Sequence, residues 1–408
     1  VHRLRWTNSS GDGNLSRSRS ERRQRCCLCR YADAAVNGQL ILASLARHMS
    51  ILQSLSITSI RNIQQAALKL SPGVNLLHGE NGSGKTSVLE SIHLLATGRS
   101  FRTSKPGTLI SETEPSALVV AELSNGHQIG LTRSRRKGHQ LNMNSEKQRN
   151  WDKVARELPV QVLDANSFLL LDGGPKARRR FLDWGAFHVE PLFVDQWRKT
   201  RKCIANRNLL LRKSSPDPDQ LRAWDLQLCK ASGAVDMARS NYFNCFVPIF
   251  DQVYESLSAS SPNVLSLSYY RGWDGDQELS EVLRHSEITD KKYGATQCGP
   301  HRADLVVKAG SRLAIETLSR GQQKILVSAL KIAQGVLLSQ ALDRSCVYLV
   351  DDLPAELDRT NRQKVLEKLV GLKGQLFVTC VDREALQISP ANSPEMATFH
   401  VKRGTITA

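Results

Sequence analysis

The sequence predicts an α/β protein, and three observations indicate this class. Short apolar runs rich in branched residues, at 73–79, 345–350 and 375–380, have the pattern of buried central strands. A glycine-rich loop and then apolar residues at helical spacing follow the first run, which makes a strand–loop–helix unit. The region 176–260 is mostly helical in pattern and strongly basic at its start.

Two more strands are expected before this unit, because residues 55–57 and 68–70 alternate between apolar and polar around the sequence RNIQQ. The helix after the glycine-rich loop is expected to end at Gly98. Residues 117–145 have the alternation of strands joined by a basic turn, RSRRKG.

Composition excludes some classes of protein. The chain has 408 residues, 40% hydrophobic and 23% charged, as expected for a soluble globular protein of two or three domains. No apolar run is expected to reach the ~18–20 residues of a membrane helix. The net charge of +17 favours an anionic partner, nucleic acid first and a membrane surface second. A basic protein without such a partner is the alternative.

The nine cysteines are scattered, which fits a reducing cytoplasm better than a disulfide framework. Cys26, Cys27 and Cys29 form a tight cluster, but no second ligand pair follows at zinc-site spacing. A zinc site is therefore not expected.

Residues 1–48 differ from the rest of the chain. They contain nine Arg, no Lys and three acids, and Met49 stands where the strand-like alternation begins. Three interpretations compete: a disordered nucleic-acid-binding tail, a targeting peptide, or translated sequence upstream of a start at Met49. We favour a disordered or spurious extension that the folded protein does not need.

The glycine-rich loop, HGENGSGKTS, contains the complete phosphate-binding pattern G-x-x-x-x-G-K-[ST] between an expected strand and an expected helix. Backbone N–H groups of such a loop curl round phosphate oxygens, and the helix N-terminus adds partial positive charge. Lys85 is expected to reach the β and γ phosphates of ATP, and Thr86 to bind Mg²⁺ through its hydroxyl. The expected nucleotide-binding residues here are Gly79, Glu80, Asn81, Gly82, Ser83, Gly84, Lys85 and Thr86.

The stretch SCVYLVDDLPAELD supplies a second half of the site. An apolar strand ends at Asp351, which is placed to hold Mg²⁺, and Asp352 follows where a carboxylate can polarise the attacking water. Asp is one methylene shorter than Glu, so slow hydrolysis is expected. A capping role is the alternative for Asp352.

The stretch LSRGQQK opens an apolar helical run, and Ser319 stands three residues before Gln322, the spacing of a capping box. A phosphate loop, then LSRGQ, then a strand ending in two acids is the order of the ATP-binding-cassette class. In that class the signature helix binds the γ-phosphate of a second copy, so Ser319, Gly321 and Gln322 are expected to act across an ATP-dependent homodimer.

From Met49 onward the sequence resembles the RecF family of DNA replication and repair proteins. The resemblance rests on GRSFR, GGPKARRRFLDW, CGPHRADL, TLSRGQQK and YLVDDLPAELD, in that order. It implies a cytoplasmic bacterial ATPase without a long coiled coil, which binds ATP, Mg²⁺, double-stranded DNA and single/double-strand junctions. It also implies a RecR-type mediator as partner, with RecA loading on gaps as the outcome.

Motifs and resemblance together predict a P-loop ATP-binding-cassette ATPase head with an inserted, mainly helical second lobe. The expected divisions are 1–48, the extension; 49–165, the first part of the ATPase lobe; 166–290, the helical lobe; and 291–408, the second part of the ATPase lobe. One departure from the family pattern is that Asp164 or Asn166 must replace an acid usual before GGP.

Three basic runs are candidates for DNA contact: 133–137, 176–180 and 197–213. A solvated face is the alternative for each run, and pairing of Arg179 and Arg180 with acids between the lobes is a further one. Two other functions compete with the one that the family implies. One is a transporter ATPase subunit, and the other is a DNA clamp in which ATP only locks a dimer.

Overall fold

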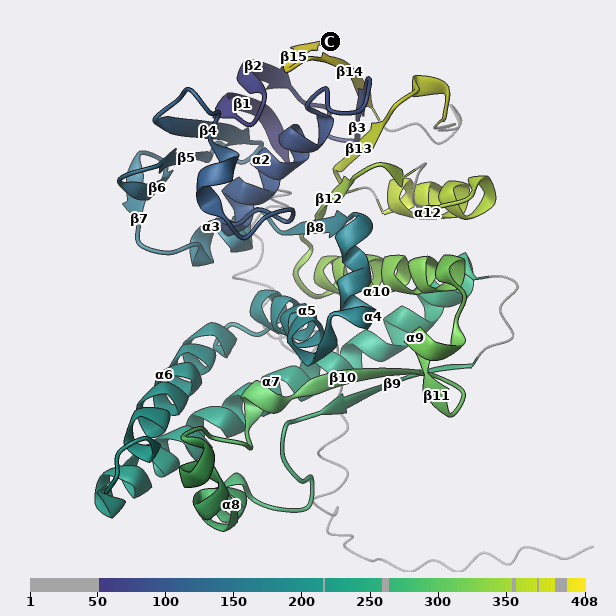
Figure 1. Cartoon of the computed structure of the whole chain (residues 1–408). Helices are drawn as coiled ribbons and strands as arrows, with labels where there is room; N and C mark the ends of the chain where they lie inside the picture. Colours follow the sequence, from purple (N-terminus) through teal and green to yellow (C-terminus); the bar gives the residue numbers. More distant parts are fainter. Residues whose placement is uncertain (1–50, 216, 259–263, 354–356, 373, 386–394) are drawn as a thin grey trace, which may run out of the picture.

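The computed structural model describes residues 51–215, 217–258, 264–353, 357–372, 374–385 and 395–408. The expected extension at 1–48, with Cys26, Cys27 and Cys29, lies outside these residues. The described chain forms two stacked parts, one with two six-stranded sheets and one built mainly of helices (Figure 1). This confirms the predicted α/β ATPase head with a helical second lobe.

The central sheet contains the three apolar runs found in the sequence. Its strand order is β15-β14-β3-β13-β12-β8, in which β14, β3, β13, β12 and β8 run parallel. All residues of β8, β12 and β13 are buried, because helices and a second sheet cover both faces. The strands are β3 (Val74–His78), β8 (Val160–Leu163), β12 (Val347–Val350), β13 (Leu376–Cys380), β14 (Met396–Lys402) and β15 (Thr405–Thr407).

The second sheet is antiparallel and has the order β2-β1-β4-β5-β6-β7. Helix α2 (Lys85–Thr97) lies between it and the central sheet, and its apolar residues share one core with both. The helix ends at Gly98, which has the left-handed backbone expected of a glycine cap. The strands are β1 (Leu52–Ile60), β2 (Ile63–Lys69), β4 (Ser116–Leu123), β5 (Gln128–Ser134), β6 (Gly138–Met143) and β7 (Glu146–Gln148).

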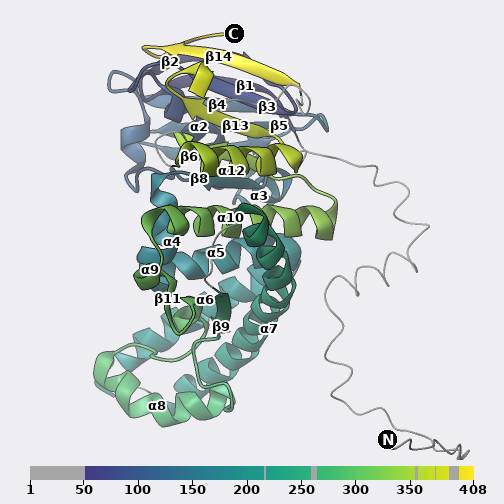
Figure 2. The same cartoon turned by 90° about the vertical axis from the view of Figure 1, so that its right-hand side faces the viewer.

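The helical lobe is built round α7 (Pro218–Leu257), which at 40 residues is the longest helix in the described part of the chain. It packs along α6 (Phe193–Leu211) and under α10 (Arg320–Leu342), as Figure 2 shows from the side. A three-stranded sheet, β11-β10-β9, completes the lobe. Its strands are β9 (Leu265–Tyr270), β10 (Asp304–Ala309) and β11 (Arg312–Leu313).

The remaining described elements connect these parts. The helices are α3 (Asp152–Glu157), α4 (Leu169–Asp172), α5 (Gly174–Val189), α8 (Leu279–Tyr293), α9 (Ala314–Thr317) and α12 (Arg359–Gly371). The short 3₁₀ turns are η3 (Pro106–Leu109), η4 (Ala165–Phe168), η5 (Pro300–Arg302) and η6 (Arg383–Ala385). The expected division at 290/291 falls inside α8, and β10 pairs with β9, so we propose a later division, after β11.

Helix α10 corrects the expectation that no segment is as apolar as a membrane helix. Among the described helices it alone is long and apolar enough to cross a membrane, by length and composition. However, 67% of its apolar stretch is buried inside the protein, where it packs on α7, α5 and β8. Its apolarity is therefore that of a core helix between the two lobes.

The basic run 176–180 is partly structural. The guanidinium of Arg178 donates to both carboxylate oxygens of Asp304, at 2.8 and 2.9 Å, and Arg179 donates to the carbonyl of Ala303 at 2.7 Å. Two of the stretches that carry the family resemblance, GGPKARRRFLDW and CGPHRADL, are thus joined directly. Arg178 and Arg179 are occupied by this contact, whereas Arg180 is exposed.

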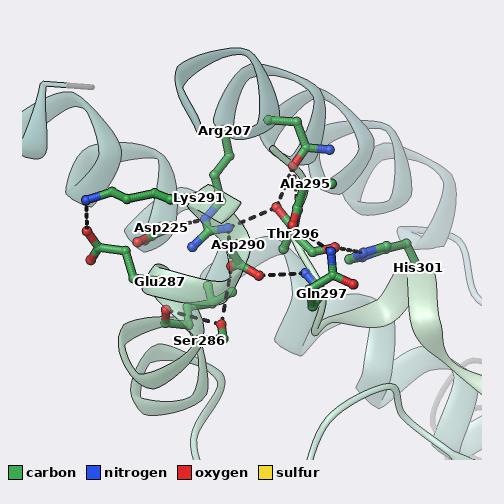
Figure 3. Close-up of polar contacts among 12 residues, drawn as sticks. Arg207, Asp225, Ser286, Glu287, Asp290, Lys291, Ala295, Thr296, Gln297 and His301 are labelled. Carbon is green, nitrogen blue, oxygen red and sulfur yellow. Dashed lines mark hydrogen bonds and ion pairs between the residues drawn. The ribbon is translucent and has the colours of Figure 1, made fainter. Parts of the chain in front are cut away.

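The basic run 197–213 also contains a residue with a structural role. Arg207 is fully buried, and its guanidinium donates to Asp225 at 2.5 Å, to Asp290 at 2.6 Å and to the hydroxyl of Thr296 at 3.0 Å (Figure 3). These partners come from α7, from α8 and from the segment after α8, so one side chain of α6 holds three pieces of the lobe together. The backbone N–H of Gln297 donates to the second oxygen of Asp290 at 2.9 Å.

Replacing Arg207 with Met should destabilise the protein by about 3–5 kcal/mol, because the fully buried carboxylate of Asp290 then lacks its countercharge. Urea unfolding measures this loss. Arg222→Met is the matched control, since Arg222 pairs with Asp219 at the surface and its loss should change stability little. Equal effects of the two substitutions would contradict the assigned role of Arg207.

Candidate functional site

The glycine-rich loop follows β3 and leads into α2, as predicted. Gly79, Gly82 and Gly84 all have positive φ, which glycine adopts without strain. A Cβ at Gly79 would lie 2.1 Å from the carbonyl oxygen of Val401 on β14, so no larger residue fits there. Backbone curvature and close packing therefore both require glycine in this loop.

Lys85 is the first residue of α2 and is buried beneath the loop. Its ammonium donates to the carbonyls of Gly79 at 2.6 Å and Glu80 at 2.9 Å. Burial lowers the pKa of Lys85, and the nearby carboxylates of Asp352 and Asp351 partly oppose this shift. The two hydrogen bonds thus hold the Lys85 side chain at the base of the loop.

Thr86 and Asp351 meet although 265 residues separate them. The hydroxyl of Thr86 donates to the carboxylate of Asp351 at 2.9 Å, and the hydroxyl of Thr379 donates to the same oxygen at 2.8 Å. Burial raises the pKa of Asp351, while these two hydrogen bonds act in the opposite direction. A hydroxyl and a carboxylate side by side form the oxygen donor set that Mg²⁺ prefers, so these residues fit the ion.

Asp352 completes one wall of the same site. Its backbone N–H donates to the Thr379 hydroxyl at 2.8 Å, and its φ of 49° is uncommon for a residue other than glycine. Asp351 and Asp352 line a cavity of about 250 Å³ together with Lys85, Thr86 and the rest of the loop from Asn81. The loop from Asn81 onward and the acid pair, predicted from distant parts of the sequence, therefore line one cavity, whereas Gly79 and Glu80 are not among its described lining residues.

Arg61 and Asn62 also border this cavity, and the sequence reasoning missed both. The side-chain amide of Asn62 donates to the carbonyls of Gly82 and Ser83, at 3.1 and 2.9 Å, and so supports the loop from outside. Arg61 has a positive φ of 54° in the turn between β1 and β2. The polar pair RN, which stands between two stretches of alternating apolar and polar residues, was the sequence signal that could have identified them.

Glu90 links this turn to the stretch GRSFR. It is fully buried on α2, and its carboxylate accepts hydrogen bonds from Arg61 at 2.9 and 3.0 Å and from the hydroxyl of Ser100. This anchors the loop after α2 and places Arg102 on the wall of the same cavity. Arg102 was part of the family resemblance but had no predicted role.

The signature stretch forms the predicted helix cap. Ser319 caps α10: its hydroxyl accepts from the backbone of Gln322 at 3.3 Å, and the Gln322 side chain accepts from the backbone of Ser319 at 2.9 Å. Ser319 and Gly321 are exposed. None of Ser319, Gly321 and Gln322 is among the described residues that line the cavity. Within one subunit the signature and the phosphate loop therefore remain apart.

Asp164 and Asn166, the two candidates for the missing family acid, lie in different surroundings. Asp164 caps η4 by accepting from the Ser167 hydroxyl at 2.7 Å, and its charge contributes to raising the pKa of Asp351. Asn166 instead lines a separate cavity beside the GRSFR loop. Asp164 is therefore the one of the two whose charge acts on Asp351, and neither residue is among the described residues that line the cavity with the phosphate loop.

The fold and the cavity define an ATPase head of the ATP-binding-cassette class. Residues 51–407 match the family model described as RecF/RecN/SMC N terminal domain. Proteins named DNA replication and repair protein RecF from Pseudomonas putida (strain GB-1) and Pseudomonas syringae pv. syringae (strain B728a) are each 44% identical over 360 residues. Each alignment covers 87% of this chain and 98% of the relative. The chain belongs to the RecF family.

Solved structures show the same fold. The recombination mediator protein RecF bound to ATP superposes with a TM-score of 0.78 at 24% identity, over 88% of this chain and 98% of that chain. An Smc head domain from Pyrococcus furiosus superposes with a TM-score of 0.53 at 14% identity, over 88% and 95% of the two chains.

Replacing Asn62 with the isosteric Asp should weaken ATP binding about tenfold or more, because a carboxylate would face two loop carbonyls in place of an N–H donor. Titration with a fluorescent ATP analogue measures the affinity. Asn142→Asp, at a partly exposed amide on β6 that accepts from Gln140, is the control. Unchanged affinity in the Asn62 variant would show that the loop holds its shape without this support.

Proposed function

We propose that this protein is an ATP-dependent DNA-binding protein of recombinational repair. It hydrolyses ATP slowly on its own and faster when DNA is bound. The observation that carries the proposal is the convergence of Lys85, Thr86, Asp351 and Asp352 on one cavity. The relatives are named for DNA replication and repair, and the solved ATP-bound neighbour is described as a recombination mediator protein of the RecFOR pathway.

Each residue of the cavity has a distinct role in this proposal. Lys85 holds the terminal phosphates of ATP, and Thr86 and Asp351 hold Mg²⁺, which neutralises phosphate charge when bound. Asp352 takes a proton from the attacking water. Its side chain is one methylene shorter than Glu, so we expect slow hydrolysis.

The exposed signature at the tip of α10 supports an ATP-dependent homodimer. Ser319 and the N–H groups of the first turn of α10 form an anion-binding end of a helix that lies outside its own subunit's cavity. A second copy related by twofold symmetry would bring this end to the γ-phosphate held by its partner. ATP would then stabilise the dimer at two sites.

Double-stranded DNA, single/double-strand junctions and a RecR-type mediator are the proposed partners, with RecA loading on gaps as the outcome and the cytoplasm as the location. The net charge of +17 supports an anionic partner, and membership of the RecF family supports the rest. Sedimentation with ATP, with ADP, and with or without duplex DNA tests the proposal. A protein that stays monomeric and unbound under all conditions would contradict it.

Two rival functions predict different results. A transporter ATPase subunit would float with membranes, and the matches to RecF over 98% of their length argue against it. A DNA clamp in which ATP only locks the dimer would release no phosphate. A DNA-stimulated phosphate-release assay separates that clamp from a slow ATPase.

Lys85→Arg should abolish ATP-driven dimerisation or hydrolysis and leave the fold intact. The planar guanidinium cannot replace a compact ammonium that fits between the carbonyls of Gly79 and Glu80. Turnover and sedimentation measure the effects, and circular dichroism checks the fold. Wild-type dimerisation and turnover in this variant would count against the assigned site.

Ser319→Arg should prevent ATP-driven dimerisation but leave ATP binding by the monomer within about twofold, because its own phosphate loop is untouched. Asp352→Asn should instead bind ATP and dimerise while hydrolysing slowly. A mixture of the two variants should form heterodimers with at most one closed site. Loss of monomer ATP binding in the Ser319 variant would mean that Ser319 acts within its own subunit.

A further inference from the structure

A second cavity lies beside the nucleotide-binding cavity, between the GRSFR loop, β5, η4 and α5. Its volume is about 590 Å³, within the usual range of ligand pockets. Arg99, Arg102, Arg133 and Arg180 line it, from three separate parts of the sequence. We call it the arginine cavity.

The charge of the arginine cavity is not balanced by the protein. None of the residues that line it is acidic. Within the described part of the chain, no ion pair is formed by Arg99, Arg102 or Arg180, and all three side chains are exposed. Arg133 is half-buried, and its guanidinium donates to the carbonyl of Gly98 at 3.1 Å. Four like charges round one hollow repel one another, and an anion in the hollow would relieve that repulsion.

The chemistry of these side chains selects phosphate. Guanidinium groups bind phosphate oxygens in a bidentate manner and keep their charge at any physiological pH. The hydroxyls of Ser100, Thr103 and Ser104 and the amide of Asn166 add neutral hydrogen-bonding groups to the same walls. Other arginines of the basic runs that were candidates for DNA contact are instead neutralised: Arg178 pairs with Asp304, and Arg207 pairs with Asp225 and Asp290.

We propose that the arginine cavity binds phosphate groups of a nucleic-acid backbone, and that Arg102 connects this site to the nucleotide-binding cavity. Arg102 lines both cavities. Asp351 and Asp352 line the nucleotide-binding cavity together with Arg102. A phosphodiester bound by Arg102 in the arginine cavity therefore changes the position of a side chain that also lines the nucleotide-binding cavity, which offers a physical route by which DNA alters ATP hydrolysis. This inference rests on the DNA binding proposed above and locates that binding at the arginine cavity.

The test uses Arg99→Gln combined with Arg180→Gln in the full chain. Neither residue lines the nucleotide-binding cavity, so ATP affinity should stay at the wild-type level. Arg136→Gln combined with Lys137→Gln is the matched control, because it removes the same charge from the exposed turn after β5, outside the arginine cavity. Duplex affinity is measured for each protein with ATP, over a salt series.

Each lost phosphate contact lowers the salt slope by about 0.9, so the double cavity variant should lose about 1.8. Between about 50 and 200 mM salt its affinity should then fall about tenfold less than that of the wild type. The control should keep the wild-type slope, and Arg99→Lys with Arg180→Lys should recover most of it. DNA stimulation of hydrolysis should fall together with the slope.

Other outcomes overturn the inference in distinguishable ways. A wild-type protein that binds no DNA would defeat both the proposed function and this inference. Wild-type DNA binding with no change in the cavity variant, or an equal loss in cavity variant and control, would defeat the inference alone. Lost ATP affinity with unchanged DNA affinity would mean that the cavity receives phosphates of the nucleotide instead of the DNA backbone.

Discussion

The parallel pairing of β3 with β13, and of β13 with β12, is the constraint on which the rest of the structure depends. The carboxyl ends of these strands lie at one edge of the sheet, so the residues that follow them meet there. Thr379 lies on β13, Asp351 follows β12, and Thr86 lies in the first turn of α2 after the loop that follows β3. Hydrogen bonds of 2.8 and 2.9 Å join Thr379 and Thr86 to Asp351. Without this register the loop and the acid pair would be separate pieces of sequence.

The shape of the site then depends on polar groups behind it. Burial of the Glu90 carboxylate is tolerated because Arg61 and Ser100 both donate to it. This one carboxylate sets the turn that carries Asn62 and the loop that carries Arg102. The two cavities therefore share Glu90 as a support and Arg102 as a lining residue. A substitution in one cavity is expected to affect the other through this short path of covalent and hydrogen bonds.

Several features of the fold and the site were predicted from local patterns and confirmed. The alternation at 55–57 and 68–70 became β1 and β2, and the apolar runs at 345–350 and 375–380 became β12 and β13. Gly98 ends α2, and Ser319 caps α10 with Gln322. These features depend on residues close together in the sequence, through hydrophobic periodicity, helix capping and glycine conformation, which a sequence displays directly.

Other predictions failed or could not be made, because they depend on partners far along the chain. Basic runs do not reveal which arginines form ion pairs with distant acids: Arg207 pairs with Asp290, 83 residues away, and Arg178 pairs with Asp304, 126 residues away. Helix α10 has a membrane-like composition that only its burial between two lobes explains.

The sequence by itself determined the phosphate loop, the acid pair, the signature cap and the family, because each is a short pattern with its own chemistry. The tertiary structure alone decided which charges are free. Ion pairs with aspartates neutralise Arg178 and Arg207, while Arg99, Arg102 and Arg180 line a cavity that has no acidic residue. The physical reason is that the effect of a charge depends on its neighbours in space, and strand pairing and helix packing set those neighbours.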